Sequence, residues 1–347
     1  MPNAPKNILI IKPSSLGDIV LALPALTALR KSFPNAATTW LVRPTFAQLL
    51  ENHPHLDQII PFDRELLGRA WFDPSALGAL ISLISRLRRA RFDLLFDFQG
   101  LFRTASLAWL SACPKRFGMA HAREFAHLFY SQKVPREPHR IHLVDYYLDI
   151  IRAAGAAALE AEFILPHNPA AADSVAALLR ADDVAPDSYA VLVPGSAHSD
   201  KCWPVERFAA LAARIASDFS LAIVATGTKA ESHNVEKLAG LAPVPVANLA
   251  GRTSLAELIE LMRNARLVVT NDTGPGHIAA ALGVPMVMIF GRSNPARVAP
   301  YQRPDCIAAI DPDRRGDKPD STDPKHHIAL ITLDHVLQKA RSQLSTK

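Results

Sequence analysis

One polar segment of the chain has the residue types and the order of a phosphate-binding turn. Residues 271–277 read Asn-Asp-Thr-Gly-Pro-Gly-His, follow the apolar run Leu267–Val269 and precede an alanine-rich stretch. The first turn of a helix has unpaired backbone N–H groups and the positive end of the helix dipole, which together favour an anion. The glycines at 274 and 276 are expected to let the backbone approach that anion. Asp272 either caps the turn or accepts from a ligand hydroxyl.

Two further segments repeat this order of strand, polar turn and helix. Residues 13–18 (Pro-Ser-Ser-Leu-Gly-Asp) lie between a buried strand predicted over 7–12 and a helix predicted over 19–33. Residues 194–201 follow the apolar run Tyr189–Val193, and they add a cation, Lys201. Because the turns are far apart in the sequence, we expect them to belong to two domains.

The elements that position these turns are those of a parallel α/β fold. Short β-rich runs alternate with helical periodicity, at residues 39–42, 58–61, 94–97, 221–225 and 286–290. Ligands of such sheets bind at the carboxyl ends of the strands, so the three turns are expected to line one crevice. An alanine- and proline-bearing stretch, residues 155–168, predicts a domain boundary at residue 167.

The predicted domains are therefore residues 1–167 and 168–327. The polar tract 311–325 is predicted to be a mobile loop. The last segment, residues 328–347, contains a predicted helix over about 333–344, which we expect to pack back on the first domain.

Composition limits the classes of function. The chain has 347 residues, 49% of them hydrophobic, which is enough for a large core, and a net charge of +5. That charge favours an anionic ligand or surface, but 38 Lys and Arg against 33 Asp and Glu do not demand nucleic acid. The arginines of residues 86–91 are either a solvated helix end or a membrane-surface contact.

The cysteines and the apolar runs of the sequence indicate the compartment. Three scattered cysteines do not form a disulfide framework or a zinc site, and this predicts the cytoplasm. The opening apolar run is too short for a secretory signal, and no stretch approaches the roughly 20 residues that span a bilayer, so membrane contact must be peripheral.

Neither the G-x-G-x-x-G motif of a dinucleotide dehydrogenase nor the phosphate loop of an ATPase is present.

Five segments in order give the chain a resemblance to a known family: Ser14–Asp18, Asp97–Leu101, Ala122–Glu124, Asp200–Pro204 and Asn271–His277. Together they resemble the bacterial heptosyltransferases of glycosyltransferase family nine, over nearly the whole chain. The third and fourth segments, with Leu128–Tyr130, are most similar to the type I branch.

The resemblance implies a GT-B fold, in which two Rossmann-like domains hold the acceptor (N-terminal) and the nucleotide-sugar (C-terminal). The implied enzyme transfers L-glycero-D-manno-heptose from ADP-heptose to Kdo of the lipopolysaccharide inner core (Kdo2-lipid A), with inversion and without a metal or other cofactor. We therefore expect a monomer at the cytoplasmic face of the inner membrane, in peripheral contact with it, that binds no nucleic acid.

Inversion requires a base that deprotonates the acceptor hydroxyl, and Asp18 matches the family's base position. Its alternative role is to cap a helix that begins at Ile19. On the donor side, the resemblance implies that Lys201, with Ser196, Thr273 and Gly274, stabilises the leaving diphosphate. Asp272 would hold a donor hydroxyl.

Two further donor-side residues each have a structural alternative. His277 either supports Asp272 or packs in the core. Glu231 matches a ribose-binding position but is also compatible with a surface helix.

For the acceptor we expect Arg103 and Arg123, because arginine pairs well with carboxylates and phosphates. Ser15 and Gly17, beside the base, are expected to contribute. Glu65 and Gly68 stand where the family often has arginines.

Three alternative functions remain open at this stage. The closest is another family-nine transferase, of type II or III or with a different donor or acceptor. A nucleotide-sugar 2-epimerase with the GT-B fold is less expected, and it would consume its substrate without an acceptor. A silent sugar-nucleotide binder should have lost Asp18 or Lys201, and both are present.

Overall fold

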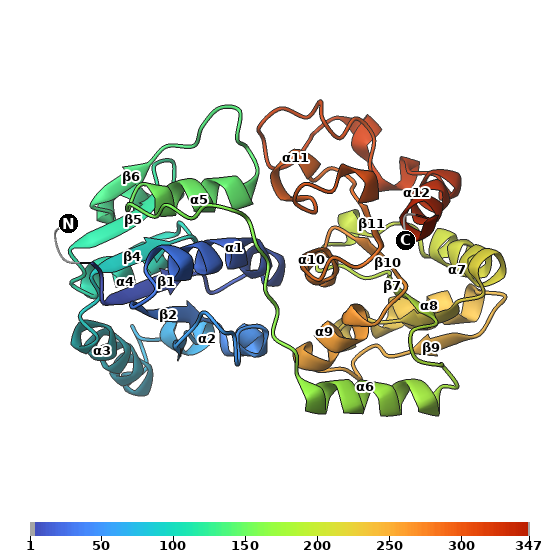
Figure 1. Ribbon diagram of the computed structural model, residues 1–347, viewed down its shortest axis with the longest axis horizontal. Coiled ribbons are helices and arrows are strands. Elements are labelled where there is room, and N and C mark those ends of the chain that lie inside the picture. The colour runs from blue at the N-terminus through green and yellow to red at the C-terminus, as the bar shows by residue number, and fades with distance from the viewer. Residues whose placement is uncertain (1–3, 346–347) are drawn as a thin grey trace. The chain divides into compact units, whose positions relative to one another are not determined.

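The computed structural model describes residues 4–345. The chain divides into two compact units, residues 1–166 and residues 167–347, whereas the sequence analysis placed the division after residue 167. Each unit contains one six-stranded sheet in which every neighbouring pair of strands is parallel. The prediction of a parallel α/β fold is thus confirmed (Figure 1).

The sheet of the first unit has the strand order β3-β2-β1-β4-β5-β6. Its strands are β1 (Asn7–Ile11), β2 (Ala37–Val42), β3 (Gln58–Pro61), β4 (Leu94–Asp97), β5 (Lys115–Met119) and β6 (Gln132–Val134). Its helices are α1 (Leu16–Ser32), α2 (Arg64–Leu67), α3 (Pro74–Arg89), α4 (Phe102–Leu110) and α5 (Leu143–Arg152), with the short 3-10 helices η1 (Pro44–Leu49) and η2 (Ala126–Phe129).

Helices cover both faces of this sheet, because its strands are apolar on both sides. Leu95 of β4 belongs to a buried cluster with Leu83 of α3 and Leu107 of α4. The next residue, Phe96, faces the other way, since side chains alternate along a strand. Its ring is stacked with that of Phe98, which in turn contacts Tyr147 of α5. Helices α3 and α4 therefore lie on one face and α5 on the other, where it packs with α1 (Figure 1).

The second sheet has the strand order β12-β11-β10-β7-β8-β9. Its strands are β7 (Tyr189–Val193), β8 (Ala222–Ala225), β9 (Val246–Asn248), β10 (Leu267–Asn271), β11 (Met286–Ile289) and β12 (Ile307–Ala308). Its helices are α6 (Pro169–Ala181), α7 (Val205–Phe219), α8 (Ser232–Leu241), α9 (Leu255–Arg263), α10 (Gly274–Ala281), α11 (Pro295–Val298) and α12 (Leu333–Ser345), with the 3-10 helices η3 (Ser199–Lys201), η4 (Lys229–Glu231), η5 (Pro304–Cys306), η6 (Pro324–His326) and η7 (Ile328–Leu330).

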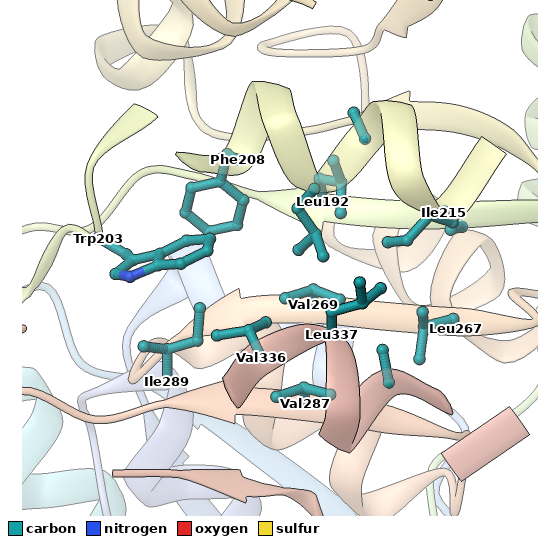
Figure 2. Close-up of a cluster of buried hydrophobic side chains, with 14 of the residues drawn as sticks. Leu192, Trp203, Phe208, Ile215, Leu267, Val269, Val287, Ile289, Val336 and Leu337 are labelled. Atoms are coloured by element: carbon teal, nitrogen blue, oxygen red, sulfur yellow. The ribbon is translucent and has the colours of Figure 1, made fainter. Parts of the chain in front are cut away.

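The C-terminal helix belongs to the core of the second unit. Val336 and Leu337 of α12 are buried in the same cluster as Val269 of β10 and Phe208 of α7 (Figure 2). The indole nitrogen of Trp203 donates to the Ile331 carbonyl at 2.8 Å and fixes the segment before the helix. The prediction that residues 328–347 pack on the first domain is therefore wrong for residues 328–345, because their apolar side chains are used within the second unit; residues 346 and 347 lie outside the described part.

The polar tract 311–325 is held by hydrogen bonds, which its composition did not predict. The guanidinium of Arg315 donates to the Ser293 carbonyl at 2.7 Å and to the Ile310 carbonyl at 2.6 Å. The side-chain amide of Asn294 donates to the carbonyls of Gly316 and Lys318, both at 2.9 Å. The polar side chains of this region thus satisfy its backbone, and the expectation of a mobile loop is not supported.

Within residues 4–345, no helix combines the length and the apolar character that a bilayer span requires.

Candidate active site

The carboxyl end of β1 leads into the predicted base, Asp18. Helix α1 begins at Leu16, three residues earlier than predicted, and its N-cap residue is Ser15. One carboxylate oxygen of Asp18 accepts from both the backbone N–H and the hydroxyl of Ser15, each at 3.2 Å. Asp18 therefore lies in the first helical turn and is not the N-cap of a helix starting at Ile19. Gly17 is buried in the same turn, whereas Ser15 is exposed.

A lysine that the sequence analysis did not single out contacts the base. The ammonium of Lys12 lies 3.3 Å from the Asp18 carboxylate; the Lys12 side chain is only 4% exposed and that of Asp18 is 33% exposed. The Trp40 indole donates to the Lys12 carbonyl at 3.1 Å, which fixes the backbone at this position. The sequence contains one signal for this residue: Lys12 ends the strand predicted over 7–12, in which Asn7 is the only other polar residue. A nearly buried ammonium requires a counter-charge, and Asp18 supplies it.

The loop after β4 supports the loop after β1. The buried carboxylate of Asp97 accepts from the backbone N–H groups of Gln99 (2.9 Å) and Gly100 (3.2 Å), and from the Tyr130 hydroxyl (2.8 Å). Burial raises the pKa of Asp97, and these hydrogen bonds offset the rise only in part. The Gln99 side chain accepts from the Ser14 N–H at 3.4 Å. The motif at 97–101 thus positions the motif at 14–18.

The third motif of the first unit lies against the same loop. The backbone N–H of Arg123 donates to the Gly100 carbonyl at 3.2 Å, and the Glu124 carboxylate accepts from the Phe102 N–H at 3.1 Å. Within residues 4–345, the guanidinium groups of Arg103 and Arg123 form no ion pair, so both are available to an anion. Glu65, at a position where an arginine was expected, lies 3.7 Å from Arg43 instead.

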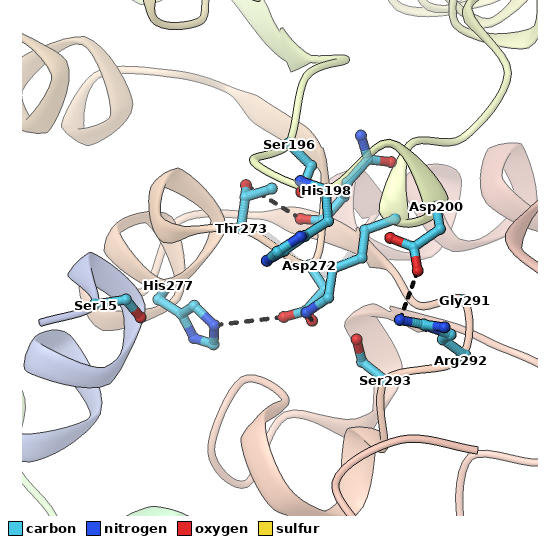
Figure 3. Close-up of polar contacts among 12 residues, drawn as sticks. Ser15, Ser196, His198, Asp200, Asp272, Thr273, His277, Gly291, Arg292 and Ser293 are labelled. Carbon is cyan, nitrogen blue, oxygen red and sulfur yellow. Dashed lines mark hydrogen bonds and ion pairs between the residues drawn. The ribbon is translucent and has the colours of Figure 1, made fainter. Parts of the chain in front are cut away.

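In the second unit, Lys201 and Asp272 form one polar centre with His277, and Figure 3 shows the His277 ring beside the Asp272 carboxylate. The Lys201 ammonium donates to Asp272 at 2.8 Å, and the other carboxylate oxygen lies 3.7 Å from the His277 ring nitrogen. Burial alone would raise the pKa of Asp272, but its contact with His277 and the charge of Lys201 outweigh burial and hold that pKa well below its ordinary value. His277 is itself buried, so its contact with Asp272 and its packing role coexist.

Asn271 fastens the loop that carries Lys201. Its side-chain nitrogen donates to the carbonyls of Pro194 (2.9 Å) and Gly195 (3.3 Å), and its side-chain oxygen accepts from the Trp203 N–H at 3.0 Å. A single buried side chain at the end of β10 therefore holds both ends of the loop after β7. The sequence analysis missed this role, although Asn271 opens the most informative motif.

Thr273, Ser196 and Gly274 lie at the edge formed by these two loops. Thr273 is the N-cap residue of α10, which begins at Gly274, and the hydroxyl of Thr273 lies 3.0 Å from that of Thr270. The Ser196 hydroxyl accepts from the His198 N–H at 3.4 Å. This arrangement places two hydroxyl groups and a helix N-terminus in the unit that contains Lys201.

Gly276 has a packing role that was not predicted. A Cβ atom at this position would lie 2.7 Å from side-chain atoms of Met288 and Thr270, closer than real Cβ contacts come. The missing side chain thus allows α10 to pack closely on β10 and β11. The expectation that Gly276 lets the backbone approach an anion stays a prediction.

Glu231 reaches the same region from η4. Its carboxylate accepts from the N–H (2.7 Å) and the hydroxyl (2.8 Å) of Thr228, and a Cβ atom on Gly195 would lie 2.8 Å from its other oxygen. The side chain therefore caps its own turn and lies against the loop that carries Ser196. Glu231 is therefore not an isolated surface glutamate.

An ion pair that the sequence analysis did not identify joins this loop to the loop after β11. The guanidinium of Arg292 lies 2.7 Å from the Asp200 carboxylate (Figure 3). Asp200 directly precedes Lys201, so Arg292 adds a second restraint on the position of the lysine. Both partners are exposed, and such pairs contribute little to stability.

Two parallel α/β units, each with polar loops at the carboxyl ends of its strands, are the architecture of a GT-B glycosyltransferase. Residues 80–324 match the sequence model described as Glycosyltransferase family 9 (heptosyltransferase), and the chain belongs to that family.

Relatives along most of the chain carry consistent names. The chain is 28% identical over 318 residues to the lipopolysaccharide core heptosyltransferase OpsX of Haemophilus influenzae, which covers 88% of this chain and 85% of that one. It is 30% identical over 304 residues to lipopolysaccharide heptosyltransferase 1 of Pseudomonas aeruginosa, covering 86% and 82%. Relatives named heptosyltransferase 2 and 3 also match, at 26% and 23% identity.

Solved structures agree with these relatives. The structure described as E. coli heptosyltransferase WaaC with ADP-2-deoxy-2-fluoro heptose superposes with a TM-score of 0.76 at 25% identity, covering 97% of this chain and 99% of that one. The GT-B fold and the glycosyltransferase class are thereby established for this chain, within the lipopolysaccharide heptosyltransferases.

Proposed function

We propose that this chain is a type I heptosyltransferase. It would transfer L-glycero-D-manno-heptose from ADP-heptose to Kdo of the lipopolysaccharide inner core (Kdo2-lipid A), with inversion at the anomeric carbon. The name of the Pseudomonas relative and the ADP-heptose analogue in the similar E. coli structure support this reaction. Relatives of types 2 and 3 match less closely, so the type rests on residues 122–124 and 200–204, which resemble the type I branch.

The observation that carries the proposal is the contact between Lys201 and Asp272. Departure of ADP builds negative charge on the diphosphate, and an ammonium that is already fixed stabilises this charge without reorganisation. Asp272 and the loop held by Asn271 fix Lys201. Ser196, Thr273 and Gly274 would add donors to the diphosphate, Glu231 would bind the ribose, and Asp272 with His277 would bind a donor hydroxyl.

Asp18 would act as the base on the acceptor side. In the proposed step, the acceptor oxygen bonds to the anomeric carbon while the bond from that carbon to the diphosphate oxygen breaks. ADP leaves with the electron pair, and the proton of the acceptor hydroxyl goes to Asp18. Lys12 is a positioning residue, because it holds the carboxylate that receives the proton. Arg103 and Arg123, with Ser15 and Gly17 nearby, would bind the carboxylate of Kdo or the phosphates of lipid A.

An acceptor of this kind is lipid-borne, so the proposal includes peripheral contact with the inner membrane from the cytoplasmic side. It involves no nucleic acid, metal or other cofactor, and it does not require more than one copy of the chain.

A panel of acceptors tests the type. ADP-heptose would be incubated with Kdo2-lipid A, with a core acceptor that already carries one heptose, and with no acceptor, while ADP release is followed. We expect release with Kdo2-lipid A alone. A preference for the heptosylated acceptor would assign a later transferase of the family, and conversion of the nucleotide-sugar without an acceptor would indicate an epimerase.

A further inference from the structure

Exposed hydrophobic side chains are concentrated on α3, α4 and η2 of the first unit and in the short segments before α3 and η2. Among the described residues, ten large hydrophobic side chains are exposed, and eight of them lie between residues 71 and 128. We call these eight the apolar face: Trp71, Phe72, Leu77, Ile81, Phe102, Trp109, Phe125 and Leu128. The two tryptophans are 90% and 56% exposed, although such side chains normally contribute to a core. An exposed concentration of this kind marks an interaction site.

The two longer helices of the apolar face, α3 and α4, lie on the same side of the sheet. Leu83 and Leu87 of α3, with Leu107 and Ala108 of α4, are buried against β1 and β4. The opposite sides of both helices therefore point outward. Leu77 and Ile81 are one turn apart on α3, and the Arg88 side chain donates to the Leu110 carbonyl at 2.8 Å, which joins the ends of the two helices.

Ring contacts connect α4 to η2. The ring of Phe129 lies 5.5 Å from that of Phe102 and 6.4 Å from that of Trp109, both edge to face. Phe125, the residue before η2, is 74% exposed and has a φ of 58°. This left-handed conformation is strained for a bulky residue, and an exposed side chain recovers none of that cost by packing within the chain. A binding partner that covers Phe125 would offset it.

The same segment carries an excess of positive charge. Residues 63–134 contain eleven Lys and Arg against six Asp and Glu, a difference equal to the net charge of the whole chain. Two of the six carboxylates are turned to the protein: Asp97 is buried, and Asp93 accepts from the N–H groups of Lys6 and Asn7. Each Lys or Arg near an anionic bilayer strengthens binding to it.

We propose that the apolar face docks on the surface of an anionic lipid bilayer. Tryptophan and phenylalanine suit the boundary between head groups and acyl chains, and the surrounding arginines pair with lipid phosphates. Charge complementarity favours this partner over a second copy of the chain, which would bring the same positive charge to the contact. This inference rests on the proposed function, because a lipid-borne acceptor would meet the enzyme at the bilayer surface. It is tested separately, because vesicle binding is measured without donor or acceptor.

Vesicle sedimentation tests the proposal, with phosphatidylcholine vesicles that contain or lack phosphatidylglycerol. We expect the full chain to bind the anionic vesicles, less tightly at high salt. The double variants Trp71→Ser with Phe72→Ser, and Trp109→Ser with Leu128→Ser, should weaken binding about tenfold or more. The matched controls are Leu241→Ser and Leu330→Ser, at positions 49% and 53% exposed in the second unit, and they should bind like the unchanged chain.

Tryptophan emission adds a readout specific to the apolar face. The other two tryptophans, Trp40 and Trp203, are buried, so a blue shift on adding vesicles reports Trp71 and Trp109. The proposal is overturned if the unchanged chain ignores anionic vesicles or if the controls lose as much binding as the face variants. It is equally overturned if the chain forms dimers that the face variants abolish while vesicle binding is unaffected. Turnover on a delipidated Kdo acceptor, which the face variants should retain, separates this failure from failure of the proposed reaction.

Discussion

Lys201 and Asp272, 71 residues apart in the sequence, form an ion pair of 2.8 Å in which the carboxylate is 8% and the lysine side chain 26% exposed. The two residues were identified separately, one as the cation of a diphosphate site and the other as a ligand for a hydroxyl. In the structure they depend on each other, because the Asp272 carboxylate holds the Lys201 ammonium in position. A partly exposed ammonium that is already held in place can respond to charge on a leaving diphosphate.

The first prediction concerns the variant Lys201→Ala. Loss of the ammonium should lower kcat about 10²- to 10³-fold and weaken ADP binding, because charge on the departing diphosphate is no longer stabilised. Steady-state kinetics and calorimetric titration with ADP provide the two values. Lys237→Ala, which removes a surface ion pair with Glu206, is the control. Unchanged kinetics for Lys201→Ala would remove this residue from the site.

Asp18→Asn should separate catalysis from donor binding. The amide keeps the shape of the carboxylate but cannot take up the acceptor's proton, so kcat should fall about 10²- to 10⁴-fold while ADP affinity is retained. The comparison variant is Asp334→Asn, which alters an exposed carboxylate in the first turn of α12. Near-normal turnover by Asp18→Asn would show that another group accepts the proton.

Lys12→Met should slow turnover without unfolding the protein. Methionine fills a similar volume, and the Asp18 carboxylate that loses its partner is 33% exposed, so water can solvate it and limit the loss of stability. The carboxylate of Asp18 would lose its contact at 3.3 Å, and we expect kcat to fall roughly 10- to 100-fold with ADP binding intact. Partial recovery in Lys12→Arg would support a positioning role. If kcat is unaffected, the ion pair has no part in the reaction.

The buried side chain of His53 should make the folded protein less stable in mild acid. Burial, with a smaller contribution from the nearby His55, lowers the pKa of His53 to about 4. The folded state therefore binds fewer protons than the unfolded state between the ordinary pKa of about 6.5 and pH 4, so its stability is present above pH 6.5 and is lost as pH falls through this window. The loss should reach about 3 kcal/mol at pH 4.

Urea unfolding of the His53→Asn variant at pH 7.5 and pH 4.5 checks this. The backbone N–H of His55 donates to the Nδ1 atom of His53 at 3.1 Å. Asparagine retains an acceptor for this N–H but does not titrate. The difference in unfolding free energy between the two pH values should be smaller in the variant. His327→Asn is the matched control, since His327 is exposed and accepts from the Ala329 N–H in the same way. An equal pH dependence in His53→Asn and the unchanged chain would contradict the assignment.

The sequence predicted what depends on local pattern. The predicted strands lie within two residues of the observed bounds, because apolar runs such as Tyr189–Val193 and Leu94–Asp97 are bounded by clear breaks. The strands β5, β6, β9 and β12 were not predicted. The start of α1 was predicted at Ile19, with capping as the alternative role of Asp18, whereas Ser15 occupies the N-cap position and Asp18 lies in the first turn. Both residues are compatible with capping, and the sequence alone does not choose between them.

Long-range partners were the part that could not be predicted. The destination of α12 depends on which core its apolar side chains enter, and the same pattern fits either unit. Asn271 acts on the loop after β7, whose residue Trp203 is 68 positions away in the sequence. The contact between Lys12 and Asp18 spans only six residues, but the near-complete burial of the Lys12 side chain, which makes the contact necessary, depends on the packing around β1. The packing role of Gly276 was not predicted, because the atoms that would exclude a side chain there come from β10 and β11.

The mass of the lipid product tests the central claim most directly. The purified chain would be incubated with ADP-heptose and Kdo2-lipid A, and the lipid analysed by mass spectrometry beside a parallel reaction with Asp18→Asn. The account predicts a lipid heavier by one heptose residue, formed together with ADP, and little such product from the variant. Intact ADP-heptose and an unchanged lipid in the presence of folded protein would contradict it.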